Sequence, residues 1–168
     1  MKKNIFSWLT IALMAIVCVG FSACGSDGDD DGGNGGGGST SDLVGTWKRV
    51  YKLETKYQKN SSGQWEQVGQ EEKTYDNVSA HGFQFNADKT AKSIYISPDG
   101  TITPESRDDF EYKVQNGQLY MLELDESDTD GWESWGYIQI SGNEFVLTEE
   151  DIDGTRREVD IKHYRKIK

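Results

Sequence analysis

The sequence predicts an all-β protein: an antiparallel up-and-down meander of eight to nine strands, closed into a barrel and preceded by a disordered, acidic, Gly-rich tether. From residue 43 onward, apolar and polar residues alternate in short runs without helical periodicity. Clusters of turn-forming residues separate these runs. Closure into a barrel would remove the two exposed edges that an open meander leaves.

The alternating runs are expected to form strands at 46–57, 65–76, 82–86, 90–97, 109–114, 118–124, 135–141, 144–149 and 156–166. The breaks between them are rich in Asn, Asp, Gly, Ser and Pro, which favour turns. Asn116-Gly117 suits a tight primed turn between two hairpin strands. Because every connection is short, a meander is the simplest topology.

The beginning of the chain has the layout of a signal peptide, expected over residues 1–23. Lys2 and Lys3 precede an uncharged, largely apolar run that ends at Phe21. An uncleaved membrane helix is the alternative, although the run is at the lower length limit for one. Phe21-Ser22-Ala23-Cys24 resembles a bacterial lipobox, with Phe21 in place of the usual leucine. The resemblance implies that Cys24 carries lipid and anchors the chain in a membrane.

The segment after Cys24 predicts a location. Gly25 stands where an aspartate would retain a lipoprotein in the inner membrane, and an acidic run over 27–31 resembles the export signal of some surface lipoproteins. The resemblance implies an outer-membrane anchor with the protein facing the cell exterior; a merely solvated charge run is the alternative. Residues 24–42 would then be the lipidated cysteine and its linker. Cys18 leaves with the signal peptide, so no intrachain disulfide is expected.

The charge balance excludes one class of partner. The chain has 18 basic and 29 acidic residues, and loss of Lys2 and Lys3 leaves 16 basic residues and a net charge of −13. Such a surface repels the phosphate backbone, so nucleic-acid binding is not expected.

Three short motifs carry a resemblance to the lipocalin-like domains of secreted bacterial surface lipoproteins. They are Gly45-Thr46-Trp47, "GFQFNADKTA" at 82–91, where Lys89 replaces the usual glycine, and "YKVQNGQLYM" at 112–121. The resemblance covers residues 43–168 and implies a single lipocalin-like barrel domain, with an unrelated β-sandwich as the alternative. It also implies that Trp47 lies at the closed barrel end beside an arginine of the last strand. Alternation in that strand selects Arg165, on the face shared with Val159, Ile161 and His163.

The same alternation predicts what the barrel interior contains. If Trp47 points inward, Tyr51 and Leu53 do so as well, with Ile94, Ile96, Val114, Phe145 and Leu147 on later strands. A filled core and a ligand pocket remain alternatives at this volume of aromatic side chains. The family resemblance favours a narrow pocket for a small apolar or amphipathic ligand, without a cofactor. Its expected lining is Tyr51, Phe83, Phe85, Phe110 and Tyr112.

A second function class is an interaction module at the cell surface. Trp132 and Trp135 would be its exposed aromatics, binding a glycan or a partner outer-membrane protein.

No enzyme is expected, because the sequence has no nucleophile motif and its acidic clusters (27–31, 125–130 and 149–153) fall in the tether or in expected turns. No metal site is expected either. Residues 125–137 imitate the first half of a calcium loop but lack its second half, and His81 and His163 are expected in a turn and in the core.

Overall fold

The computed structural model describes residues 39–124 and 131–168, which form one antiparallel sheet with a short 3-10 helix in front of it. All nine predicted strands are confirmed. The elements are η2 (Thr40–Leu43), β1 (Gly45–Lys59), β2 (Trp65–Thr74), β3 (Ala80–Phe85), β4 (Thr90–Ile96), β5 (Ile102–Gln115), β6 (Gln118–Glu123), β7 (Glu133–Ser141), β8 (Glu144–Asp153) and β9 (Arg156–Lys166).

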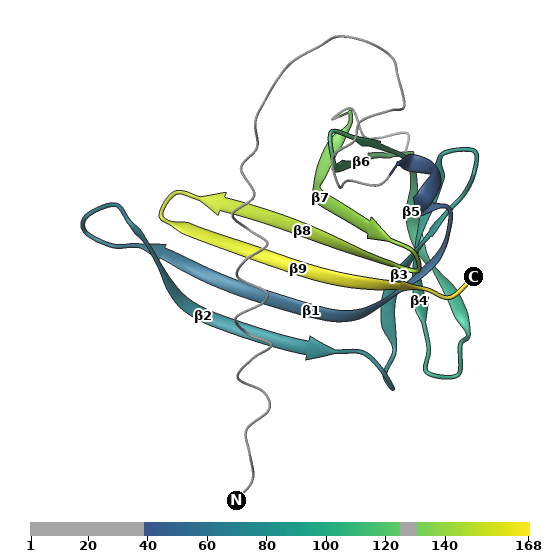
Figure 1. Ribbon diagram of the computed structural model, residues 1–168, viewed down its shortest axis with the longest axis horizontal. Helices are drawn as coiled ribbons and strands as arrows, with labels where there is room; N and C mark the ends of the chain where they lie inside the picture. Colours follow the sequence, from purple (N-terminus) through teal and green to yellow (C-terminus); the bar gives the residue numbers. More distant parts are fainter. Residues whose placement is uncertain (1–38, 125–130) are drawn as a thin grey trace, which may run out of the picture. The chain divides into compact units, whose positions relative to one another are not determined.

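The sheet closes into the predicted barrel (Figure 1). Neighbouring strands follow chain order from β3 to β9, and β1 pairs with both β3 and β9. Eight strands therefore complete the ring, while β2 pairs with the C-terminal half of β1, from Tyr51 onward. The up-and-down meander is confirmed, with β2 added outside the ring.

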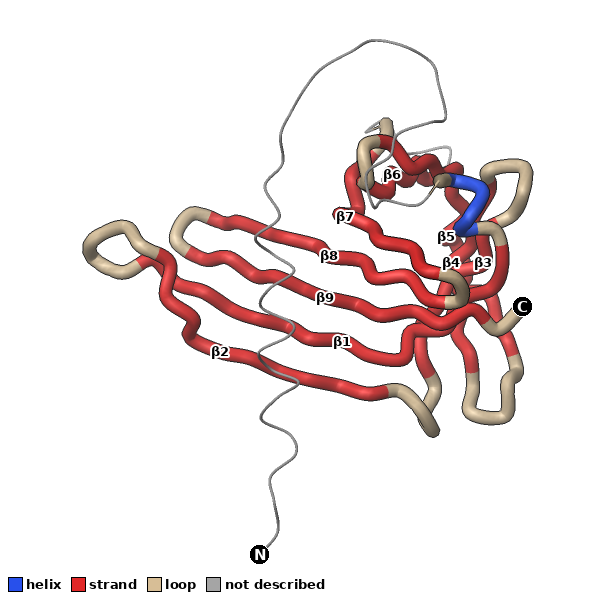
Figure 2. Tube along the Cα trace, viewed as in Figure 1, coloured by secondary structure: helices blue, strands red, loops and turns tan. Residues whose placement is uncertain are grey.

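The distal parts of β1, β8 and β9 continue beyond the ring together with β2. These four strands run side by side as a twisted extension of the sheet (Figure 2). One of its faces carries a chain of ion pairs: Lys52 lies 2.8 Å from both Glu54 and Asp160, and Lys56 lies 2.6 Å from Glu54. The extension is thus held mainly by backbone pairing and by charges.

Two strands, β5 and β8, extend furthest beyond their predicted bounds. β5 begins at Ile102, because the polar segment around Pro104 hides a strand that pairs with β4. β8 continues to Asp153, so the expectation that the acids at 149–153 lie in a turn is wrong. Each residue from 144 to 153 pairs with β9, where basic side chains face several of the acids.

Turn chemistry explains two of the hairpins. Asn116 and Gly117 both have positive φ, 53° and 72°, and join β5 directly to β6, which confirms the primed turn. Lys89 also has a positive φ, 68°, at the position where the lipocalin-like pattern has glycine. A side chain there disfavours the left-handed conformation that the turn requires.

One end of the barrel is closed by η2 and a packed aromatic core. Leu43 and Trp47 are completely buried, and the Trp47 indole Nε1 donates a 2.6 Å hydrogen bond to the Leu43 carbonyl. Phe145 packs edge-on against Trp47 with ring centroids 4.9 Å apart, and Phe85 packs in the same way against Tyr112 at 4.7 Å. This part of the barrel is filled with side chains.

The last strand presents the opposite face from the one predicted. Tyr164 is buried and stacks on Phe145 at 4.4 Å, so its neighbours His163 and Arg165 point outward. Val159 and Ile161 share that outer face and are half-buried. Ile94 and Ile96 are buried, but they lie outside the cluster that fills the barrel.

Within the described residues, no helix is long and apolar enough to span a membrane.

Candidate functional site

The structure does not bring the five residues predicted to line a pocket together around one cavity. Phe85 and Tyr112 belong to the filled core, where the Tyr112 hydroxyl donates to the Asn86 carbonyl at 3.0 Å. Burial raises the pKa of Tyr112 to about 12, with a smaller contribution from Asp88. Phe110 is also buried in the core cluster. Of the five, Phe83 borders a cavity.

The expectation for Tyr51 is wrong. The register between β1 and β9 shifts between Arg49 and Tyr51, so one residue of β1 has no partner and the alternation inverts. Tyr51 therefore lies on the outer face, edge-on to His163 at 5.2 Å. Its hydroxyl donates to Glu72 at 2.5 Å, and burial followed by this bond raises its pKa to about 12.

The predicted contact between Trp47 and Arg165 is also wrong. Arg165 pairs in register with Lys48 and forms an exposed ion pair with Glu144 at 3.2 Å. The neighbouring residue, Lys166, pairs with Trp47, and its Nζ lies over the indole ring at 5.1 Å. A basic residue of the last strand does approach Trp47, but it is Lys166 and not Arg165, which the predicted alternation selected.

A cavity of about 240 Å³ opens on the side of the core away from η2. Its position follows from the register: Lys162 precedes Lys166, the partner of Trp47, by four residues, or about 13 Å along the strand. The lining residues come from six strands of the ring: Arg49, His81, Gly82, Phe83, Ser93, Trp135, Glu149, Lys162 and Tyr164.

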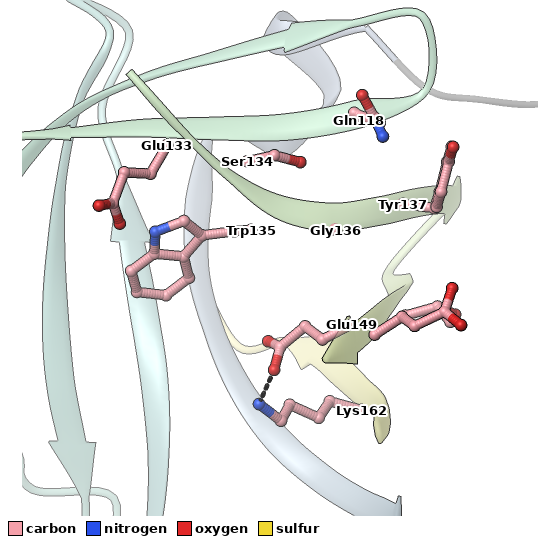
Figure 3. Close-up of a pocket in the computed structure, with 10 residues that line it drawn as sticks. Gln118, Glu133, Ser134, Trp135, Gly136, Tyr137, Glu149 and Lys162 are labelled. Carbon is pink, nitrogen blue, oxygen red and sulfur yellow. Dashed lines mark hydrogen bonds and ion pairs between the residues drawn. The ribbon is translucent and has the colours of Figure 1, made fainter. Parts of the chain in front are cut away.

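A second, larger cavity of about 620 Å³ shares part of this lining. Trp135, Glu149 and Lys162 border both cavities. Figure 3 shows the Trp135 ring and the Glu149–Lys162 ion pair extending from different strands toward the same space. These three side chains therefore stand between the two cavities.

Trp135 reaches the cavity because of a bulge in β7. Leu119 pairs with Gly136 and Tyr120 with Ser134, so Trp135 has no partner in the register. Gly136 has a φ of 128°, and a Cβ there would lie 2.3 Å from the Thr148 carbonyl oxygen. Only a glycine allows this close approach. The bulge places the side chain of the preceding residue, Trp135, on the inner face of the sheet.

Aromatic rings form one wall of the smaller cavity. The Trp135 ring packs edge-on against Phe83 at 5.6 Å and against Phe110 at 5.4 Å. Tyr164 lies 5.6 Å from Phe83 and is almost completely buried, and this burial raises the pKa of its hydroxyl. The wall is therefore apolar and built from rigid side chains.

Charged groups complete the lining beside these rings, with Arg49 paired in register with Tyr164, and most of the charged groups are paired. Lys162 forms an ion pair with Glu149 and lies 3.5 Å from Asp160. Arg49 differs, since none of its side-chain nitrogens forms an ion pair or hydrogen bond with another described residue. Its Nε is buried, and its guanidinium lies 4.7 Å above the centre of the Tyr75 ring.

His81 lies at the rim of the cavity, in β3 rather than in the turn that was expected. Its Nδ1 lies 2.8 Å from Glu105, which orients the imidazole, and Ser93 lines the same cavity. A serine, a histidine and a carboxylate are the components of a nucleophilic triad. However, no hydrogen bond joins the described side chains of Ser93 and His81, so the three groups are not assembled as a triad in this structure.

Three carboxylates on the extension approach one another closely enough to hold a cation. Oxygens of Glu54, Glu158 and Asp160 lie within 4.8 Å of each other. Lys52, Lys56 and Lys162 lie against this group, and hydrogen bonds from Lys52 and then Lys56 lower the pKa of Glu54 to about 2. These ammonium groups would compete with a metal ion for the carboxylates.

The two tryptophans of the alternative surface site are not brought together. Trp132 is partly exposed, and the Lys113 ammonium lies over its ring at 4.1 Å, whereas Trp135 packs on the core. Cys24 and the acidic stretch 125–130 lie outside the described residues. The predictions of lipid attachment and of an incomplete calcium loop therefore remain predictions.

The sequence analysis missed Arg49, Glu149, Lys162 and Tyr164 as lining residues. Lys162 and Tyr164 were missed because the wrong face was chosen for the last strand, and Glu149 because it was expected in a turn. Arg49 lies two residues after Trp47 and before the bulge, so simple alternation already places it on the inner face. Gly136 was an available signal, because a glycine inside a strand often marks a bulge. Nothing in the pattern of β1 marks the bulge at Val50.

No protein-family model matches this chain, and neither a curated protein nor a solved structure matches it significantly.

Proposed function

We propose that this protein is a lipid-anchored binding protein of the outer membrane, without catalytic activity, whose barrel binds a small amphipathic ligand. The observation that carries the proposal is the cavity of about 240 Å³, which is lined by both aromatic rings and charged groups. Ligand sites combine an apolar surface with a few polar groups in this way. The filled core next to η2 limits the ligand to the opposite half of the barrel.

The proposed location rests on the sequence. The lipobox-like Phe21-Ser22-Ala23-Cys24 and the acidic run after it support lipid attachment at Cys24 and display on the cell exterior. The resemblance to lipocalin-like lipoprotein domains supports a ligand-binding barrel. Together, these features suit a protein that captures a small molecule outside the cell.

Ligand capture can be tested on the protein from its own host. Native mass spectrometry of the anchored chain should reveal an additional small-molecule mass. The variant Ser93→Phe places a ring inside the cavity and should abolish that mass, whereas Ser141→Phe, at an exposed strand end, should retain it. If no small molecule accompanies the unmodified protein, and titration with small amphiphiles gives no signal, the proposal is wrong.

The sheet extension favours a second candidate, an interaction module. Within residues 39–124 and 131–168, β2 pairs only with β1, so its other edge is open to a partner strand. Val68 has no partner in the β1 register and is 64% exposed. A photoreactive residue at position 68 should crosslink to an outer-membrane protein in intact cells if this candidate is right, and crosslinking should be absent if it is wrong.

A further inference from the structure

The Arg49 guanidinium lines the cavity, contacts the Tyr75 ring and has no anionic partner among the described residues. No ion pair or side-chain hydrogen bond links its guanidinium to another described residue, although Nε is buried. Burying an unpaired polar or charged group costs free energy. An anionic group entering the cavity would supply the missing acceptor.

The charges around Arg49 limit the charge of that anion. Among the lining residues, Arg49 and Lys162 are cationic, and Glu149 is anionic and forms an ion pair with Lys162, so the charge of Arg49 is in excess. A monoanion compensates this charge. A dianion such as phosphate would leave surplus negative charge close to the carboxylate of Glu149.

The two kinds of lining group suggest the remainder of the ligand. A guanidinium offers parallel donors that match a planar carboxylate. Phe83 and Trp135 offer rigid apolar faces within the same cavity of about 240 Å³. We infer that the cavity binds a small aromatic or aliphatic carboxylic acid as its anion, with the carboxylate against Arg49 and the apolar body against Phe83 and Trp135. This inference rests on the proposed ligand-binding function and names the ligand class.

A pair of probes that differ in one group tests the inference. Naphthalene-2-carboxylate and naphthalene-2-methanol have the same ring system, but only the first is charged. Each is titrated calorimetrically into the full chain held in lipid nanodiscs, with protein-free nanodiscs as the blank. The carboxylate should bind about tenfold more tightly or better, because a charge-assisted hydrogen bond replaces a neutral one.

Variants locate the preference. Arg49→Met should bind both probes with the affinity of the alcohol, and Arg49→Lys should keep part of the preference. Arg157→Met removes the same charge from the outer face, where Arg157 pairs with Glu150, and should leave both affinities unchanged. Near-ultraviolet circular dichroism shows whether each variant keeps the packed core.

The outcomes distinguish failure of the carboxylate inference from failure of the proposed ligand pocket. Equal affinities for the two probes in the unmodified protein would overturn the carboxylate inference while leaving a ligand pocket, and this needs no variant. A preference that persists in folded Arg49→Met would overturn the role of Arg49. Binding of neither probe would count against the pocket itself and therefore against the proposed function.

Discussion

The two ends of this barrel are built on different principles. At the closed end, Leu43, Trp47 and Phe85 are almost completely buried, and the buried indole nitrogen has an acceptor. At the cavity end, Arg49 has no ion pair with another described residue and lies beside half-buried charges and a partly exposed tryptophan. The closed end is optimised for packing, whereas the cavity end retains unsatisfied groups.

This difference shows how one sheet can serve stability and binding together. Side chains that fill space and satisfy their polar atoms contribute most of the free energy of folding. Groups available for a ligand must remain incompletely satisfied until it binds. In this barrel the packed side chains and the incompletely satisfied groups lie at different ends of the strands. The cavity end can therefore contain unsatisfied groups, because packing at the closed end stabilises the fold.

Removing the central side chain of the closed end should have the largest effect. Trp47→Ala should lower the free energy of unfolding by about 3–5 kcal/mol, since it creates a cavity and removes the hydrogen bond to Leu43. Phe83→Ala should cost less, because that ring already borders open space. Chemical denaturation followed by circular dichroism measures both. Equal losses would contradict the distinction between the two ends.

The bulge that turns Trp135 toward the cavity should be the next most sensitive feature. Gly136→Ala should cost about 2–3 kcal/mol, because it combines a disfavoured backbone conformation with a clash against the Thr148 carbonyl. Gly63→Ala is the matched control: its φ is 78° and no atom lies within 4 Å of the new Cβ. It should cost only about 1–2 kcal/mol. Trp135 fluorescence should shift in the first variant alone.

The charged part of the cavity lining should respond differently at its two cations. Lys162→Met leaves Glu149 and Asp160 short of a partner and should cost about 1–3 kcal/mol. Arg49→Met removes a charge that has no ion pair, so stability should change by less than about 1 kcal/mol despite the lost contact with Tyr75. Thermal unfolding of both variants decides the point. A large loss in Arg49→Met would mean that this arginine is structural.

The smallest effect is expected at a turn beside the packed end. Lys89→Gly should raise stability by about 0.5–1 kcal/mol, because glycine adopts a φ of 68° without steric cost. Asn116→Gly, at a φ of 53°, should gain less, since asparagine tolerates this conformation. Scanning calorimetry resolves the two melting temperatures. A loss in Lys89→Gly would show that the lysine side chain contributes more than its backbone costs.

The fold was predictable because its signals are local. Alternation gave the nine strands, and Asn116-Gly117 gave a hairpin whose turn needs positive φ at both residues. The burial of Phe83, Phe85, Phe110 and Tyr112 also followed from alternation counted within single strands.

The site was less predictable because it depends on breaks in that alternation. One extra residue in β1 placed Tyr51 outside, and a bulge in β7 placed Trp135 inside. In β9 both faces carry apolar and charged residues. The more apolar face, which includes Arg165, was therefore predicted to point inward, whereas in the structure Tyr164 on the other face does so. The excess charge of Arg49 depends on which side chains from other strands lie beside it. These contacts join residues distant in the chain, so no single segment predicts them.

The pairing of β1 with β9 also leads us to expect a late step in folding. Residues as distant in the chain as Trp47 and Lys166 must become neighbours to close the ring. Local hairpins such as β5–β6 can form early, but closure awaits the last strand and requires the entropy loss of joining the domain's two ends. Until then β1 and β9 are unprotected edges that can pair with other chains. A chain that has not yet released its final residues from the ribosome is therefore expected to be the state most exposed to aggregation.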